Sequence, residues 1–265
     1  MHAFQYHRPT NLKDALNLGS EKSEGRYLAG GQSLVQAMKL RLSSPSDLID
    51  LNALGDLKTL KAEGDTVTIG AMVRHAEVAA SSSVKKMIPA LAALAGMIGD
   101  RQVRHMGTIG GSLANNDPAA DYPAAVLGLG ATIVTNQRKI EADKFFKGLY
   151  ETALEPGELI TAVTFPAPKR AAYMKFKNPA SRFAIVGVFV ADFGKGVRVG
   201  VTGAGPSAFR QTEMEKALTA KFAPESVANI KVKADGLNND LHASPEYRAH
   251  LVTVMAKRAV EAALK

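Results

Sequence analysis

Hydrophobic and polar residues follow two different spacings along the chain. In short runs they alternate, as in Thr66-Val-Thr-Ile-Gly70, where Val67 and Ile69 are separated by threonines. Such runs are typical of half-buried strands. In longer runs apolar residues recur three and four positions apart, as on one face of a helix. The chain is therefore predicted to mix strands and helices.

The N-terminal two thirds of the chain alternates between the two patterns. Strands are predicted at 26–29, 47–51, 66–70, 131–135 and 158–165, and helices at 10–18, 33–42, 74–81, 88–99 and 122–129. Thr10 is the expected N-cap of the first helix, and Gly19 is the expected residue in the left-handed backbone conformation just after its C-terminus. Residues 100–116 are polar and rich in glycine.

A Pro-Ala-Pro sequence at 166–168 interrupts the pattern and is the best candidate domain boundary, because proline cannot donate to a β-ladder. Beyond it, strands are predicted at 172–177, 184–191 and 196–202, and helices at 211–220 and 245–264. Consecutive strands with short connections favour an antiparallel meander. The residues alone thus indicate a mixed α/β part over 1–166 and an α+β part over 170–265.

Composition limits the chemistry. The 265 residues are 46% hydrophobic and 22% charged, which is typical of a globular protein. There is no cysteine, so this chain can form no disulfide, thiolate zinc site, cysteine nucleophile or cysteine-ligated iron–sulfur cluster. Any electron transfer must therefore use an organic cofactor. The six histidines show no metal-binding spacing, and no catalytic residue or metal ligand is predicted.

The net charge of +8 favours an anionic ligand or an acidic partner subunit. Nucleic-acid binding is not expected, because the chain has no long basic run and no tryptophan. The first residues do not resemble a secretory signal, and no apolar run reaches 18 residues. We therefore expect a cytoplasmic protein without a transmembrane segment.

Two glycine-rich turns are candidate anion sites. One lies in Leu28–Val35, and the other in Gly107–Asn116. Paired glycines let the backbone approach a ligand closely, and successive N–H groups can surround phosphate oxygens. Because neither turn contains a charged side chain, both are expected to bind through main-chain dipoles. Two ordinary tight turns remain an alternative. The chain contains no GxxxxGK[ST] loop, and the glycines of 203–208 are followed by Pro206, which has no N–H.

Five motifs occur in a fixed order along the chain: Phe4-x-Tyr6-x-Arg8-Pro9, Ala29-Gly-Gly-Gln-Ser33, Asp47-Leu-Ile-Asp-Leu-Asn52, Ile69-Gly-Ala71 and Gly107-Thr-Ile-Gly-Gly-Ser-Leu-Ala114. Each is weak alone. Together they resemble the FAD-binding medium subunits of molybdenum hydroxylases, the xanthine dehydrogenase family. The likeness to the medium subunit of aerobic carbon monoxide dehydrogenase is greatest, and it runs from about residue 3 to the last helix.

The resemblance implies a set of FAD contacts by position. They comprise the first turn, the second turn, an acid, a base and two apolar positions. The residues at these positions are Leu28, Ala29, Gly30, Gly31, Gln32, Ser33, Leu34, Val35, Ile98, Thr108, Ile109, Gly110, Gly111, Ser112, Asp121, Ile160 and Lys177. Ile98 replaces an aromatic residue of some members, and Phe183 is either a residue that covers the flavin ring or an ordinary core residue.

The resemblance also implies a fold and partners. The expected fold is α+β, with a two-subdomain FAD-binding unit of the PCMH type over 1–168. Over 169–265 the expected domain resembles the carbon monoxide dehydrogenase flavoprotein C-terminal domain, a three-stranded antiparallel sheet with helices. The partners would be a large molybdopterin-binding subunit and a small [2Fe-2S] subunit, in a dimer of heterotrimers. The implied activity is that of an oxidoreductase subunit, relaying electrons from the iron–sulfur clusters to an external acceptor. A stand-alone flavin-dependent oxidoreductase and a flavin-free assembly module are the alternatives.

Overall fold

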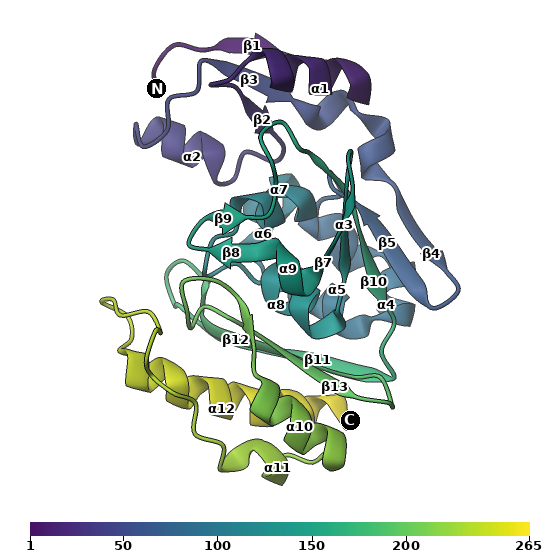
Figure 1. Cartoon of the computed structure of the whole chain (residues 1–265), viewed down its shortest axis with the longest axis vertical. Helices are drawn as coiled ribbons and strands as arrows, with labels where there is room; N and C mark the ends of the chain where they lie inside the picture. The colour runs from purple at the N-terminus through teal and green to yellow at the C-terminus, as the bar shows by residue number, and fades with distance from the viewer.

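Three main β-sheets follow one another from the N-terminal end of the molecule to the C-terminal end (Figure 1). The structure, a computed structural model, describes residues 1–265. The first sheet is parallel, with strand order β1-β3-β2. Its layer comprises β1 (Gln5–His7), α1 (Leu12–Glu21), β2 (Arg26–Leu28), α2 (Leu34–Lys39), β3 (Asp47–Asp50) and two 3₁₀ turns, η1 (Leu51–Ala53) and η2 (Gly55–Lys58).

The second sheet is antiparallel and has the order β4-β5-β10-β6-β7. The strands are β4 (Leu60–Glu63), β5 (Thr66–Gly70), β6 (Thr132–Thr135), β7 (Lys139–Glu141) and β10 (Ile160–Pro166). The helices of this layer are α3 (His75–Ala80), α4 (Ser82–Met87), α5 (Pro89–Gly96), α6 (Arg101–Met106), α7 (Ile109–Asn115), α8 (Tyr122–Leu129) and α9 (Ala142–Phe145). A small hairpin of β8 (Phe146–Gly148) and β9 (Glu151–Thr152) follows α9.

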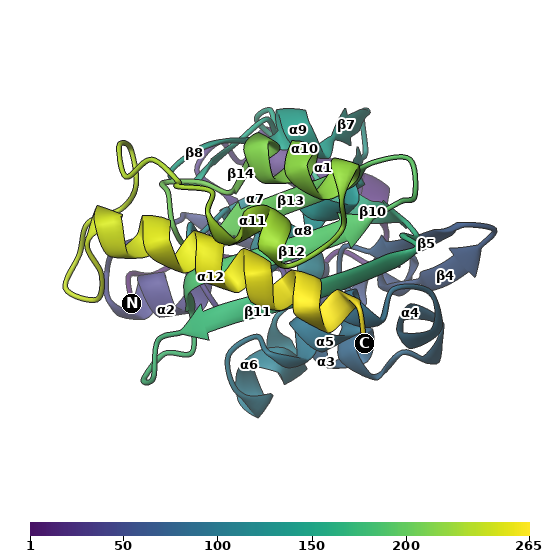
Figure 2. The same cartoon turned by 90° about the horizontal axis from the view of Figure 1, so that it is seen from below.

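The third sheet is antiparallel, in the order β11-β12-β13-β14. Its strands are β11 (Arg170–Lys177), β12 (Ala184–Asp192), β13 (Val197–Thr202) and the two-residue β14 (Phe209–Arg210). Seen from below, α10 (Thr212–Ala220), α11 (Glu225–Ala228) and α12 (Pro245–Ala263) cover its outer face (Figure 2).

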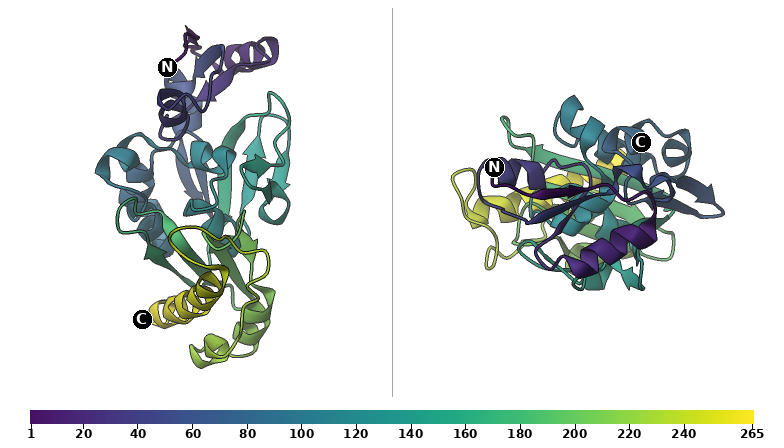
Figure 3. Two further views of the ribbon diagram at one scale, coloured as in Figure 1. Left: turned by 90° about the vertical axis from the view of Figure 1, so that its left-hand side faces the viewer. Right: turned by 90° about the horizontal axis from the view of Figure 1, so that it is seen from above.

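The central strand of the third sheet explains how the layers are joined. All nine residues of β12 are buried, because helices cover one of its faces and the second layer covers the other. Val188 and Val190 belong to the core beneath α12, whereas Phe189 belongs to the core of the second layer. The alternation that marks a strand therefore divides β12 between two cores. The first layer has a smaller core of its own and lies at the opposite end (Figure 3).

The expected α+β fold is confirmed, with local differences. Asn11, not Thr10, caps α1, because its side chain accepts a hydrogen bond from the Asp14 N–H at 2.9 Å. Gly19 lies inside α1 and not at its end, and Tyr27 packs against it where a side chain would not fit. The polar stretch after residue 100 contains the short helix α6, and β14 adds a fourth strand to the expected three. None of the helices combines the length and apolar character needed to cross a bilayer.

Candidate functional site

The structure brings the two glycine-rich turns into contact. The first turn connects β2 to α2, and the second leads into α7; Figure 1 shows them next to each other between the first and second layers. A Cβ atom at Gly30 would overlap the Met106 carbonyl oxygen and lie 2.8 Å from the Gly107 Cα atom. A Cβ atom at Gly111 would lie 3.3 Å from the Ala29 Cβ atom. Residues about 80 positions apart thus form one seam, and glycine is required where the backbones are closest.

The first turn presents a run of free backbone donors. The N–H groups of the five consecutive residues 30–34 donate to no other group of the chain. Gly31 has φ of +69°, which favours glycine, and Ser33 precedes α2 without capping it through its side chain. All five residues are at least partly exposed. Consecutive free N–H groups in a turn are suited to binding the oxygens of an anion.

The second turn differs from the expectation that it, too, binds through main-chain dipoles. The N–H groups of Ile109 and Gly110 donate to the carbonyl oxygens of Val73 and Ala71, at 3.2 and 2.9 Å. The Gly111 N–H donates to Thr108 Oγ1 at 3.2 Å, since Thr108 is the N-cap of α7. These amides fix the turn against the end of β5. The second turn can therefore let its backbone come close to a ligand and can offer the partly exposed Ser112 hydroxyl, but it does not offer a run of free N–H groups.

Two residues without an assigned role in the sequence connect the turns. The Asn52 side-chain amide donates to the Ala29 carbonyl oxygen at 3.1 Å, and its oxygen accepts from the Arg74 guanidinium at 2.9 Å. The same guanidinium donates to the Met106 carbonyl oxygen at 2.8 Å. Asn52 stands at the end of the third motif, but only the folded chain shows that it touches the first turn.

Asp121 is placed in a buried ion pair. Its carboxylate accepts hydrogen bonds from Lys175 Nζ at 2.9 and 3.0 Å and from the Tyr173 hydroxyl at 2.5 Å, and the side chain is 3% exposed. Burial raises the pKa of Asp121, while the Lys175 charge and the Tyr173 hydrogen bond oppose that rise. Lys175 also donates to the Met97 carbonyl oxygen at 3.0 Å, so the cluster joins β11 to the segment before Ile98.

The remaining positions lie outside the seam. Ile98 is half-buried and packs against the core of the second layer, and its carbonyl oxygen accepts a hydrogen bond from the Arg104 guanidinium at 2.9 Å. Ile160 is buried at the start of β10. The Lys177 side chain is exposed at the end of β11 and makes no hydrogen bond or ion pair, and Phe183 is 48% exposed in the next turn. Phe183 is therefore not a core residue.

A buried histidine supports the second turn from behind. The His75 N–H donates to the Gly107 carbonyl oxygen at 3.0 Å, and the ring packs on Tyr122 with centroids 5.3 Å apart. Burial lowers the pKa of His75 to about 4, and the Arg104 charge acts in the same direction. The ring is therefore neutral at pH 7 and serves as packing beneath Gly107, where a Cβ atom would meet His75 Nε2 at 2.5 Å.

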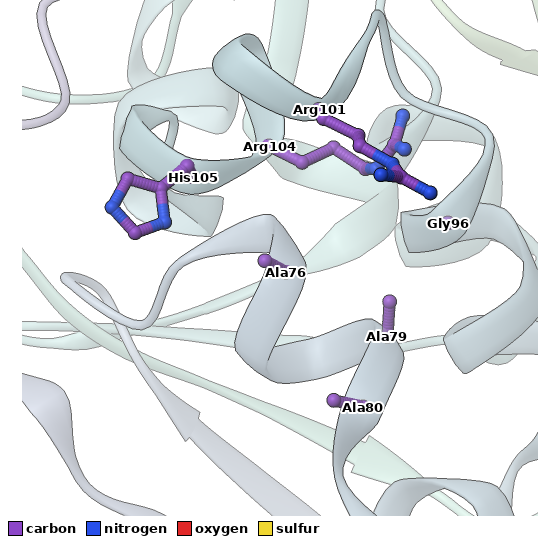
Figure 4. Close-up of a pocket in the computed structure, with 7 residues that line it drawn as sticks. All are labelled: Ala76, Ala79, Ala80, Gly96, Arg101, Arg104 and His105. Carbon is purple, nitrogen blue, oxygen red and sulfur yellow. The ribbon is translucent and has the colours of Figure 1, made fainter.

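An open pocket of about 410 Å³ lies between α3 and α6. In Figure 4, three alanines of α3 line one side, Arg101 and Arg104 of α6 extend across the other towards Gly96, and the His105 ring points away from them. None of these residues belongs to the predicted set, and only Arg104 among the basic side chains is fixed by hydrogen bonds, to Ile98 and Gly99.

Comparisons with known proteins find similar sequences and folds. Residues 2–168 match the FAD binding domain in molybdopterin dehydrogenase, and residues 171–263 match the CO dehydrogenase flavoprotein C-terminal domain. The chain is 36% identical to the carbon monoxide dehydrogenase medium chain of Afipia carboxidovorans, over 98% of this chain and 96% of that protein. It is 35% identical to the nicotine 6-hydroxylase medium subunit of Paenarthrobacter nicotinovorans, over 97% and 96%.

Two solved structures show the same fold. The CO dehydrogenase from Oligotropha carboxidovorans superposes with a TM-score of 0.92 at 33% identity, covering 99% of this chain and 98% of that one. The quinoline 2-oxidoreductase from Pseudomonas putida 86 gives 0.91 at 28% identity, covering 99% and 97%.

Proposed function

Because the chain belongs to the family of FAD-binding medium subunits of molybdenum hydroxylases, we propose that it is the electron-transfer subunit of a heterotrimeric enzyme of this kind. In this role it relays electrons from iron–sulfur clusters on a small subunit to an external acceptor. The substrate is oxidised on a large molybdopterin-binding subunit. The absence of cysteine fits this division, since this chain cannot hold an iron–sulfur cluster through cysteine.

The observation that carries the proposal is the seam between the two glycine-rich turns. Its five free N–H groups and its close backbone approach fit the diphosphate bridge of a dinucleotide. We propose that the first turn, Leu28–Val35, and the second turn, Thr108–Ser112, hold FAD there. Ile98, Asp121, Ile160 and Lys177 complete the proposed set, with Asp121 acting from its ion pair with Lys175. FAD when bound supplies both one-electron and two-electron redox chemistry.

The domain division that we propose is 1–168 for the FAD-binding unit and 169–265 for the C-terminal domain. β10 ends at Pro166 and β11 begins at Arg170, so the short connection between them contains the proposed boundary. We also place the protein in the cytoplasm.

Partner subunits are supported by exposed apolar side chains. Leu40 and Leu42 after α2, Tyr150 between β8 and β9, and Phe183 between β11 and β12 are 48–79% exposed. The loops that carry them lie on the same side of the molecule, at the left in Figure 1. Loops that expose large apolar side chains on one side of a chain are candidates for an interaction surface. We propose that the large and small subunits bind there, and that two heterotrimers associate.

Substrate choice belongs to another subunit. Relatives that are 25–36% identical to this chain over nearly equal lengths are named for carbon monoxide, glyceraldehyde, nicotine and xanthine. One type of medium chain thus serves very different substrates. This breadth supports a role in electron transfer and not in substrate recognition.

Purification of the tagged chain from its native cells tests the proposal. We expect flavin absorbance in the visible range and two co-purifying chains, identified by mass spectrometry, that carry molybdopterin and iron–sulfur clusters. A flavin-containing single chain that is active alone would instead make it a stand-alone oxidoreductase. A colourless assembly would overturn FAD binding.

A further inference from the structure

Arg74 is fixed at the junction of the two turns. It lies between β5 and α3 as the N-cap residue of α3, and its backbone N–H donates to Glu77 Oε2 at 2.7 Å. Its guanidinium donates to the carbonyl oxygens of Met106 and His105, at 2.8 and 3.2 Å, immediately before the second turn.

Asn52 extends this contact to the first turn. Its side-chain oxygen accepts from Arg74, and its side-chain nitrogen donates to the Ala29 carbonyl oxygen. Asp50 holds Asn52 in this orientation, because Asp50 Oδ1 accepts from the Asn52 backbone N–H at 2.9 Å and from its side-chain nitrogen at 2.6 Å. An unbroken chain of hydrogen bonds therefore runs from Ala29 through Asn52 and Arg74 to Met106.

The guanidinium of Arg74 forms no direct ion pair in this network. All of its guanidinium's acceptors are uncharged, and no carboxylate lies within 4 Å of it. Arg138, Arg170 and Arg210, in contrast, each pair with an acid. Neither turn contains a charged side chain, and the bridge of a dinucleotide is doubly anionic. Arg74 is thus placed to supply the missing positive charge.

On the premise of the function proposed above, we infer that Arg74, oriented by Asn52, is the cationic positioning residue of the diphosphate site. It fixes the first turn against the second, so that the free N–H groups of residues 30–34 keep one arrangement. Its charge also lowers the free energy of an anion at the seam, an effect that salt screens.

FAD titration of the deflavinated holoenzyme, followed by flavin fluorescence at several salt concentrations, tests the inference. We expect Arg74→Gln to raise the Kd for FAD about tenfold or more, because the variant loses charge-assisted hydrogen bonds. Its Kd should also depend less on salt than that of the wild type. Arg74→Lys should keep the salt dependence while losing part of the affinity, because lysine keeps the charge without the planar fork.

Asn52→Ala should weaken binding with an unchanged salt dependence, since it removes orientation and not charge. Arg101→Gln is the matched control, because Arg101 is exposed on α6 at the pocket of Figure 4 and should leave the Kd unchanged. A wild-type Kd in Arg74→Gln, or equal Kd values and salt dependences in Arg74→Gln and Arg74→Lys, would overturn the inference. A wild-type complex that binds no FAD would overturn the proposed function itself.

Discussion

Replacement of Lys175 by methionine tests the buried cluster that joins β11 to α8. Lys175 Nζ donates to both oxygens of Asp121 and to the Met97 carbonyl oxygen, and its side chain is 2% exposed. Methionine has a similar length but leaves the carboxylate with the Tyr173 hydroxyl as its only side-chain donor. Removing one partner of a buried ion pair costs about 3–5 kcal/mol. We therefore expect the unfolding equilibrium constant to rise by about two to three and a half powers of ten.

The assay is chemical denaturation of the full chain at pH 7, with Lys169→Met as the control. Lys169 is exposed just before β11, and its replacement should change the free energy of unfolding by less than about 0.5 kcal/mol. The Asp121→Asn/Lys175→Met double variant should regain most of the loss, because no uncompensated charge remains in the core. The loss in Lys175→Met should also shrink toward low pH, where Asp121 binds a proton.

A loss below about 1 kcal/mol in Lys175→Met, or a double variant no more stable than the single one, would refute this reasoning. The Asp121→Asn variant separates two roles for Asp121. If the ion pair dominates, stability falls together with any loss of FAD. If the carboxylate acts mainly on the cofactor, FAD is lost while the free energy of unfolding is unchanged.

Three further predictions concern a second buried acid, the seam and the exposed lysine of β11. Hydrogen bonds from Arg138, then from the Glu155 N–H and Thr135, hold the pKa of Glu158 at about 2 against an ordinary 4.5. Because the pKa is lower in the folded state, the ionised carboxylate adds stability that is complete above pH 4.5 and is lost toward pH 2. In denaturation curves, Glu158→Gln should therefore lower the free energy of unfolding by up to about 3 kcal/mol at pH 7 and by little near pH 2. Gly111→Val should fill the seam beside Ala29 and lower the FAD content, while the circular dichroism spectrum stays that of the folded protein. The control Gly196→Val, where a side chain points into open space, should keep its FAD, and full FAD occupancy in Gly111→Val would contradict the site. Lys177→Ala should lower the flavin reduction potential in a redox titration, and an unchanged potential would remove Lys177 from the site.

The sequence predicts the elements whose hydrophobic spacing is strong. The strands β11–β13 and the helix α12 are predicted within a few residues of their observed bounds, because their apolar residues are regularly spaced or, in β12, nearly continuous. The short elements β1 and α6 were not expected. β1 has only three residues and is held by pairing with β3 more than 40 positions away, and α6 has no buried residue that would give a pattern. Such elements depend on tertiary contacts that local spacing does not encode.

In the candidate site, too, local spacing predicts some features, and tertiary contacts determine the others. Glycine spacing alone indicates where a backbone can approach a ligand, and both turns are visible in the sequence on this basis. It does not indicate which N–H groups remain free, because this depends on which carbonyl groups lie opposite in the fold. In the second turn these are Val73 and Ala71 beyond the end of β5, whereas no carbonyl group accepts from the N–H groups of residues 30–34. The two turns are therefore expected to have different roles: the second is held rigidly by its own backbone hydrogen bonds, and the first presents free N–H groups.

The same reasoning explains why side chains at the seam were missed. Asn52 and Arg74 act on carbonyl groups 23 and 32 positions away, and such separations leave no periodic signal in the sequence. Asn52 follows the end of β3 and Arg74 follows the end of β5, and the hydrogen bond between their side chains shows that these two strand ends lie next to each other. A search for charged residues within glycine-rich motifs cannot find Arg74, because the charge comes from a third segment that packs between them. A positive charge outside both motifs can still serve a diphosphate, since close backbone approach is needed only where the glycines are.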